Sequence, residues 1–282
     1  MNKFYVSELP KESTPIDDIE NAWADAGQSK KLDKTSFNMV CSVCGNAFKA
    51  SVEELHPRIS NCKNCNSTVR WRSVAAITSI LLSGRAVPLP MLPPRPEVTV
   101  FGMSCPRIFD DKLTDKVDLW NTFFDNEPRF DITDLEEPFP GPFDLAISVE
   151  ILEHVPPPVS KAFENLYKIL KPGGILLMTV PFGNKGETLE HYPNLHDYHL
   201  EERNGKQVLI NITREGKKEE FGDLVFHGGS GFTLEIRRFS RRGLMKNLTD
   251  AGFGDIQFFD SSILPLGVYF PNKWSLPLIA IK

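Results

Sequence analysis

Strand and helix patterns alternate from residue 98 to the end of the chain. Short apolar runs predict five strands, and the last is apolar without alternation, as in a strand buried on both faces of a sheet. These runs span 98–101, 117–124, 129–132, 143–148 and 175–180. Before the last run, apolar side chains recur at helical spacing and predict a helix over 159–170, ended by Pro172-Gly173-Gly174. Buried strands that alternate with helices are typical of a doubly wound, mostly parallel α/β sheet.

Residues 184–238 interrupt this alternation. Asn204-Gly205 between two strand-like runs is a strong signal for a two-residue β-hairpin, and Glu215-Gly216 predicts a second turn before a strand over 221–226. We therefore expect these residues to form an antiparallel insertion over the sheet, on the side where a substrate would bind. The α/β pattern then resumes with a helix over 241–251, capped by Ser240 and stopped by Gly252, and with strands over 256–259 and 276–281.

The residues before 98 divide into three parts. The polar N-terminal segment contains one helical pattern, from Thr14 as N-cap to Gly27 as the stop. A cysteine module follows, and then a helix and a proline-rich linker. With the α/β domain, the predicted segments are 1–37, 38–72, 73–97 and 98–282.

Composition and charge narrow the class of protein. Of 282 residues, 41% are hydrophobic and 24% charged, which excludes a mainly disordered chain. Residues 1–7 lack the apolar core of a secretory signal, and no apolar run is long enough to cross a membrane, so we expect a cytoplasmic protein without membrane contact. The formal net charge of −5 provides no whole-chain basic field for nucleic acid.

Four of the five cysteines form two Cys-x-x-Cys pairs, Cys41 with Cys44 and Cys62 with Cys65. This spacing predicts a tetrahedral Cys₄ site for Zn²⁺, the arrangement of a zinc ribbon. Because the protein fills all four positions, the zinc would be structural. The other interpretations are a redox dithiol or a chance grouping of buried thiols. Cys105 lies apart, and we expect it to be a packed core residue.

The segment 143–155 reads FDLAISVEILEHV, and the segment 170–177 reads LKPGGILL. These residues resemble class I S-adenosylmethionine-dependent methyltransferases, in particular the broad small-molecule group (methyltransferase type 11-like) typified by enzymes of the ubiquinone pathway. Residues 239–253 are similar to the late helix and GF turn of that family. The resemblance covers 98–282 and implies methyl transfer, S-adenosylmethionine as cofactor, and a Rossmann-like seven-stranded sheet.

The resemblance assigns cofactor roles where single residues match. Gly102 and Ser104, after the first strand, would lie against the amino acid portion of the cofactor. Ser104 and Pro106 also predict the cap and first residue of a helix at this point. The acidic residue that usually ends the second strand and holds the ribose has no clear counterpart. Asn121 is the nearest candidate, and Asp118 is the next.

The resemblance also implies residues for the adenine and for the reacting methyl group. Asp131 and Ile132 match the pair that reads adenine, a carboxylate for the exocyclic amine and an aliphatic side chain for the ring face. Ser148, Val149 and Glu150, at the end of the fourth strand of the family pattern, would face the methyl group and the acceptor.

A hydroxyl acceptor needs a general base, because a neutral alcohol is a poor nucleophile. The candidates are Glu150, His154, His191, His196 and His227. For His154 the alternative is an anchor for its turn, and for His227 a place in a hairpin turn. His191 and His196 lie in a loop rich in histidine and tyrosine after the fifth strand, where α/β sheets bind ligands.

The acceptor we predict is a hydroxyl of a small molecule, sugar or glycan precursor. One alternative is an rRNA or tRNA base methyltransferase that holds RNA with its ribbon, since residues 38–72 carry a local charge of +3. The other is a non-catalytic binding module on a methyltransferase fold, which the missing G-x-G-x-x-G repeat after the first strand would permit. Nucleic acid remains the less favoured partner because the rest of the chain is acidic.

Overall fold

The computed structural model describes eight segments of the chain, namely 4–9, 36–51, 54–55, 62–135, 141–183, 186–227, 233–270 and 275–282. The helix expected between Thr14 and Gly27 lies outside these residues. Among the helices that the structure describes, none is long and apolar enough to cross a membrane.

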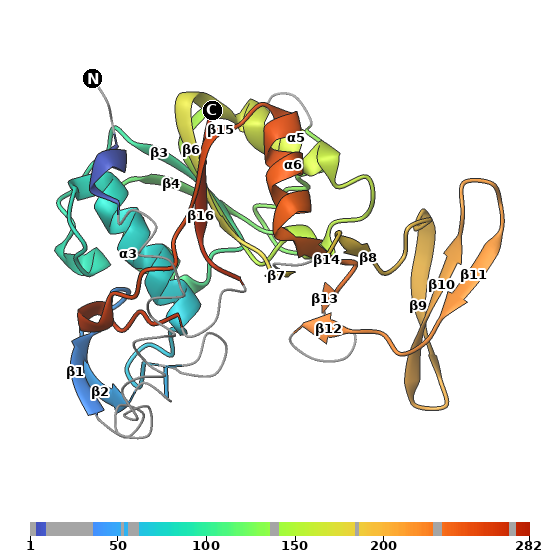
Figure 1. Cartoon of the computed structure of the whole chain (residues 1–282), viewed down its shortest axis with the longest axis horizontal. Coiled ribbons are helices and arrows are strands. Elements are labelled where there is room, and N and C mark those ends of the chain that lie inside the picture. Colours follow the sequence, from blue (N-terminus) through green and yellow to red (C-terminus); the bar gives the residue numbers. More distant parts are fainter. Residues whose placement is uncertain are drawn as a thin grey trace.

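A six-stranded sheet forms the centre of the molecule, in the order β15-β16-β6-β5-β3-β4 (Figure 1). Its strands are β3 (Thr99–Met103), β4 (Asp118–Thr122), β5 (Phe143–Val149), β6 (Leu170–Thr179), β15 (Gly254–Phe258) and β16 (Leu278–Ile281). β4, β3, β5 and β6 run parallel, and β16 runs antiparallel to both of its neighbours. The chain passes from β3 to β4 on one side and later to β5 on the other, which is the predicted doubly wound arrangement.

The number of strands differs from the prediction. Seven strands were expected in the central sheet, and the described residues form six. Residues 129–132 make only an isolated bridge, between Phe123 and Arg129. Pro128 lacks a backbone donor, and Asp131 turns the chain by accepting hydrogen bonds from the backbone N–H and hydroxyl of Thr133.

Helices cover both faces of the sheet. They are α3 (Val69–Ser83), α4 (Arg107–Leu113), α5 (Ser160–Ile169) and α6 (Arg241–Ala251). α5 and α6 share one buried cluster with Phe101 and Leu176, whereas α3 and α4 share another with Val100 and Leu177. The alternate residues of each strand therefore face opposite helix layers.

The ends of α6 confirm the predicted caps. The hydroxyl of Ser240 accepts a hydrogen bond from the N–H of Gly243, and Gly252 ends the helix in the left-handed conformation. The start of α4 differs from the prediction, because Pro106 is its N-cap and Ser104 makes no capping bond. Ser104 has instead a φ of 52°, which turns the chain before the helix.

The cysteine module joins the core of the α/β domain. Its strands β1 (Ser36–Val40) and β2 (Ala47–Ser51) form a hairpin, and α3 follows the second cysteine pair directly. Cys41, Val43 and Cys62 belong to the same buried cluster as Val98 and Val100 of the sheet. The module is thus packed as one unit with the sheet.

The interruption after β6 is antiparallel, as predicted. β9 (Asp197–Arg203), β10 (Lys206–Ile212) and β11 (Lys218–Phe221) form a three-stranded sheet that projects from the body (Figure 1). Asn204 and Gly205, both with positive φ, form the predicted turn between β9 and β10. We call this sheet the arm.

The prediction of a strand over 221–226 is wrong. β11 ends at Phe221, since the predicted turn at Gly216 brings 218–221 alongside β10. Short strands then connect the arm to the body. They are β12 (Phe226–His227), β13 (Thr233–Leu234), β7 (Phe182–Gly183), β8 (Leu189–Glu190) and β14 (Arg237–Ser240).

Four single turns of 3₁₀ helix complete the described elements. They are η1 (Val6–Glu8), η2 (Leu89–Met91), η3 (Leu152–His154) and η4 (Leu264–Leu266). η2 lies in the predicted proline-rich linker, where Leu89 and Leu92 are buried against the body. η3 follows β5 and begins the wall of the site described next.

Candidate functional site

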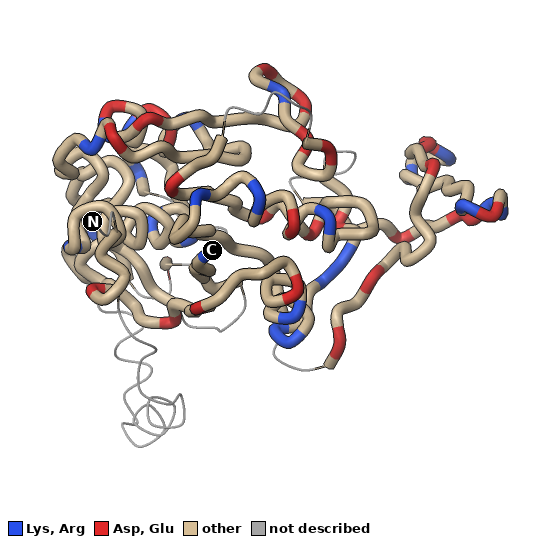
Figure 2. The backbone as a smooth tube through the Cα atoms, turned by 90° about the horizontal axis from the view of Figure 1, so that it is seen from above, with Lys and Arg blue, Asp and Glu red and all other residues tan. Residues whose placement is uncertain are grey.

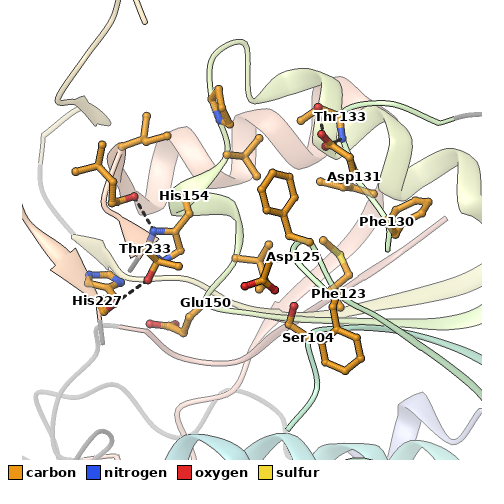
Figure 3. Close-up of a pocket in the computed structure, with 18 of the residues that line it drawn as sticks. Ser104, Phe123, Asp125, Phe130, Asp131, Thr133, Glu150, His154, His227 and Thr233 are labelled. Carbon is orange, nitrogen blue, oxygen red and sulfur yellow. Dashed lines mark hydrogen bonds between the residues drawn. The ribbon is translucent and has the colours of Figure 1, made fainter. Parts of the chain in front are cut away.

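A cavity of about 940 Å³ opens at the carboxyl ends of β3, β4 and β5. This is the switch point of the sheet, where doubly wound folds bind their ligands. Figure 3 shows polar and aromatic side chains along the cavity, from Ser104 and Phe123 at one end to His154 and His227 at the other.

Half of the predicted ligand-binding and catalytic residues line the cavity. Those that line it are Ser104, Asp131, Ile132, Glu150, His154 and His227. The others lie behind the wall or outside it, namely Gly102, Asn121, Ser148, Val149, His191 and His196.

Ser104 and Glu150 occupy matching positions on neighbouring strands. Each is the first residue after its strand, and each has a left-handed backbone, with φ of 52° and 55°. Non-glycine residues seldom adopt this conformation, and they often do so where a site needs a fixed geometry. The two turns direct the chain away from the sheet and leave the cavity between them.

Gly102 and Asn121 shape the first of these turns from behind. A Cβ atom on Gly102 would lie 2.9 Å from Oδ1 of Asn121 and 3.1 Å from Sγ of Cys105, so a larger residue does not fit. The amide of Asn121 is occupied by the backbone of Cys105, through bonds of 3.0 and 2.9 Å. Asn121 therefore supports the loop, and its amide does not face the cavity. Asp118, at the amino end of β4, lies at the opposite edge of the sheet.

Asp131 and Ile132 form one end of the cavity. Oδ1 of Asp131 accepts two hydrogen bonds from Thr133, and the carbonyl of Ile132 accepts one from the buried Asn165 of α5. Phe130 lies beside Asp131, and Phe123 also lines the cavity, nearer to Ser104 (Figure 3). This end thus offers a fixed carboxylate, an aliphatic side chain and aromatic faces.

The sequence interpretation missed Asp125. Its carboxyl group lines the cavity three residues after the end of β4, beyond the position where an acidic residue was sought. The acidic pair Asp125 and Glu127 after an apolar run could have indicated it. Arg70 was also missed, because the pattern gave no reason for a residue of the cysteine module to reach this cavity.

Glu150 is held by three partners from distant parts of the chain. Its carboxylate lies 2.9 Å from the guanidinium of Arg70 and accepts hydrogen bonds from Ser275 at 2.7 Å and Thr179 at 3.0 Å. The ion pair is largely buried, with 15% and 13% of the two side chains exposed. Because three partners engage this carboxylate, Glu150 is better suited to holding these parts of the cavity wall together than to acting as a general base.

The opposite end of the cavity carries a cluster of histidines and glutamates. Glu235 lies between His191 and His227, at 3.0 and 2.9 Å from their Nε2 atoms. The hydrogen bond from His227 lowers the pKa of Glu235 to about 2, aided by His191 and opposed by burial. His191 therefore acts behind His227, outside the cavity.

His154 and Glu153 adjoin this cluster from η3. Burial lowers the pKa of His154, whose Nδ1 lies 2.8 Å from the carbonyl oxygen of Leu234. Burial raises the pKa of Glu153, and so does the nearby charge of Glu150. His154 is therefore neutral near pH 7, with its Nε2 free of a proton. His196, in contrast, is exposed on the arm side, where its backbone N–H donates to Oδ1 of Asn211.

The four predicted zinc ligands lie together. Sγ of Cys41 is 3.7 Å from Sγ of Cys65, and Sγ of Cys44 is 3.8 Å from Sγ of Cys62. Ligands 2.3 Å from a tetrahedral Zn²⁺ would be about 3.8 Å apart, so the four thiols fit this ion. The thiol of Cys65 and burial raise the pKa of Cys41 to about 12, which means that a cation is needed to make all four groups thiolates.

The two cysteine turns have the same backbone design. The N–H of Gly45 bonds to the carbonyl of Cys41, and the N–H of Asn66 bonds to that of Cys62. Gly45 and Asn66 both adopt positive φ, which closes each turn around its thiols. Such a pair of equivalent turns is what a zinc ribbon requires.

Comparison with known families finds a match in the central segment of the chain. Residues 90–176 match the sequence model of a family described as a methyltransferase domain. This segment contains β3, α4, β4, β5, η3 and α5, and it therefore includes most of the cavity wall. No curated protein matches the chain.

Solved structures with some likeness to the chain include several methyltransferases. An S-adenosylmethionine-dependent methyltransferase from Mesorhizobium loti shares 14% identity, with 77% of this chain and 99% of that chain covered and a TM-score of 0.43. The 1,6-didemethyltoxoflavin-N1-methyltransferase of Burkholderia thailandensis shares 16% identity, covers 67% and 72%, and has a TM-score of 0.37. TM-scores below 0.5 do not establish a common fold over the whole chain.

Proposed function

We propose that this protein is an S-adenosylmethionine-dependent methyltransferase. The observation that supports this most is the cavity at the switch point, because its wall is built mainly from the segment that matches methyltransferase domains. Its volume of about 940 Å³ is at the upper end of small-molecule sites, which leaves room for a cofactor and a small acceptor together.

The end of the cavity near β3 and β4 suits the cofactor. Asp131 would accept the adenine amine, Ile132 would cover a face of the ring, and Asp125 would hold the ribose hydroxyls. The turn at Ser104 would receive the amino acid portion, with Gly102 and Asn121 supporting it. When bound, S-adenosylmethionine supplies a methyl group on a positively charged sulfur.

The end near His154 and His227 suits the acceptor. Apolar groups of the arm and its base, such as Leu200, Phe226 and Leu234, line this end together with the two imidazoles. They would exclude water from the acceptor and orient it for an in-line displacement, which accounts for much of the rate in such reactions. We propose a hydroxyl of a small molecule or sugar as the acceptor, with the unprotonated Nε2 of His154 to accept its proton.

The geometry of the four cysteines supports a structural Zn²⁺. The ligands would be Cys41, Cys44, Cys62 and Cys65, and they leave no position open for substrate. The ion would fix the module against the sheet and, through the start of α3, place Arg70 at the cavity.

Calorimetric titration with S-adenosylmethionine tests the proposed function. We expect binding by the wild-type chain and at least tenfold weaker binding by Asp125→Asn, since a hydrogen bond to a charged group is worth about 1.5–3 kcal/mol. Asp118→Asn is the matched control, because Asp118 flanks the other end of the same strand and should leave the affinity unchanged. A wild-type chain that does not bind the cofactor would contradict the proposal and favour a non-catalytic binding module.

A second measurement addresses the acceptor class. In the described chain, Lys and Arg alternate with Asp and Glu along the arm (Figure 2). We therefore expect no retention of RNA at low salt. Retention that weakens as salt is raised would favour the RNA base methyltransferase instead.

A further inference from the structure

Among the residues that the structure describes, the buried carboxylate of Glu153 has no hydrogen-bond partner on either oxygen. None of its side chain is exposed, and both Oε1 and Oε2 are unsatisfied. Two histidine nitrogens face Oε1, namely Nε2 of His154 at 3.6 Å and Nδ1 of His227 at 3.7 Å. These distances are too long for hydrogen bonds. A buried charged group normally has a close partner, so this arrangement requires an explanation.

The outer contacts of the two histidines fix where their protons lie. Nδ1 of His154 faces the carbonyl oxygen of Leu234 at 2.8 Å, and a carbonyl can only accept, so this nitrogen carries the proton. Nε2 of His227 faces the carboxylate of Glu235 at 2.9 Å and carries a proton for the same reason. The other nitrogen of each ring is then an acceptor, and it is the one directed at Glu153.

Two imidazole lone pairs therefore converge with the carboxyl group of Glu153 on one point, and neither ring presents a donor to that group. We propose that this point is a divalent metal site, with Glu153, His154 and His227 as its ligands. Ligands 2.1 Å from a tetrahedral ion would be about 3.4 Å apart, close to the 3.6 and 3.7 Å observed. All three ligand atoms lie within 4.8 Å of one another.

The surroundings have the features of a metal centre. A ligating histidine usually donates its other N–H to a carboxylate or a backbone carbonyl, as His227 does to Glu235 and His154 to Leu234. Glu235 is fixed in turn by His191. Two histidines and one carboxylate suit Mn²⁺, Fe²⁺, Co²⁺ or Zn²⁺ and leave coordination positions open.

His154 and His227 line the cavity (Figure 3), whereas Glu153 is fully buried and does not line it. The open coordination positions would therefore face the cavity. On the proposed function, the metal would bind the oxygen of the acceptor hydroxyl and lower its pKa, and the proton would pass to bulk solvent before the site closes around the acceptor. The metal would thus take the place of His154 as the group that activates the acceptor. This role rests on the methyltransferase proposal, whereas the binding of the metal does not.

Mn²⁺ binding tests the site, with the full chain loaded beforehand with a single equivalent of zinc for its four cysteines. Free Mn²⁺ gives a six-line electron paramagnetic resonance signal that is lost on binding, and thiolates do not hold this ion in competition with zinc. We expect the wild-type chain to bind one Mn²⁺ equivalent. Glu153→Gln and His227→Ala should abolish this binding, and Glu235→Gln should weaken it by about 10–100-fold.

His199→Ala is the matched control, because His199 pairs with Glu201 on the exposed arm and lies outside the cluster. It should bind Mn²⁺ like the wild type. Thermal melting of each variant shows that it is folded, and Glu153→Gln preserves the shape of the side chain. A wild-type chain that leaves the signal unchanged, or a Glu153→Gln variant that binds as tightly as the wild type, would overturn the metal site. If the same wild-type sample binds S-adenosylmethionine but not Mn²⁺, only the metal proposal fails.

Discussion

The side-chain amide of Asn121 pairs with the backbone of Cys105 in both directions. Its Oδ1 accepts from the N–H of Cys105 at 3.0 Å, and its Nδ2 donates to the carbonyl of Cys105 at 2.9 Å. Both residues are buried. The end of β4 thereby holds the loop after β3 in place, and this loop is part of the proposed binding site for the cofactor.

Replacement of Asn121 should therefore destabilise the protein. Asn121→Ala leaves the N–H and carbonyl of Cys105 buried without partners, which costs about 1–3 kcal/mol for such groups. Urea denaturation should show this decrease in the free energy of unfolding, together with weaker binding of S-adenosylmethionine. Asn194→Ala, at an exposed position where the side chain pairs only weakly with Glu219 at 3.3 Å, should change neither quantity. Equal stability of the two variants would show that the paired bonds do not fix the loop.

The ion pair between Arg70 and Glu150 should be energetically coupled. Arg70→Met leaves a mostly buried carboxylate without its cation, and we expect a loss of about 2 kcal/mol, between the values for surface and fully buried pairs. The double variant with Glu150→Gln should recover much of that loss. A double-mutant cycle from denaturation curves measures the coupling, and additive effects would contradict it.

Removal of zinc should affect the cavity as well as the cysteine module. We expect one zinc per chain by mass spectrometry under native conditions, and none in Cys44→Ser. Cys105→Ala should retain the ion, because Cys105 lies outside the cluster. Chelation should lower the melting temperature and weaken cofactor binding, since α3 begins at the second cysteine turn and carries Arg70. Full cofactor affinity in the metal-free protein would show that the module does not position this residue.

Acid should remove the contribution of Glu235 to stability. Its pKa in the folded protein is about 2, against an ordinary value of 4.5, so its contribution is complete above pH 4.5 and disappears as the pH falls toward 2. The difference in unfolding free energy between the wild type and Glu235→Gln should be about 1–3 kcal/mol near neutral pH and should shrink through this range. A difference that is constant with pH would contradict the depressed pKa. Both proteins lose zinc in acid, so the comparison isolates the glutamate.

Local signals predicted the elements of the fold well. Ser240 and Gly252 marked the ends of α6, and Asn204-Gly205 marked the turn between β9 and β10, because caps and tight turns are determined by neighbouring residues. The strand expected at 129–132 failed since the alternation of apolar residues does not show whether a partner strand is available.

The sequence was less informative about the cavity. His154 and His227 were candidates singly, but their meeting depends on the contact of η3 with β13, about 80 residues later in the chain. The buried position of Glu153 and its lack of a partner depend on the same long-range packing. No local pattern contains that information. The contact of Arg70 with Glu150 also joins distant parts of the chain, so no local pattern predicts it.

Arg72 ties the beginning of α3 to a segment almost two hundred residues later. Its side chain is fully buried and donates to the carbonyl of Gly267 at 2.7 Å and to that of Ser67, while Trp71 packs against Phe109 of α4. A truncated protein that starts at residue 90, where the methyltransferase match begins, would expose Phe109 and leave Gly267 unpaired. Expression of residues 90–282 alone should therefore yield insoluble material, and tests of the proposed function should begin with the whole chain.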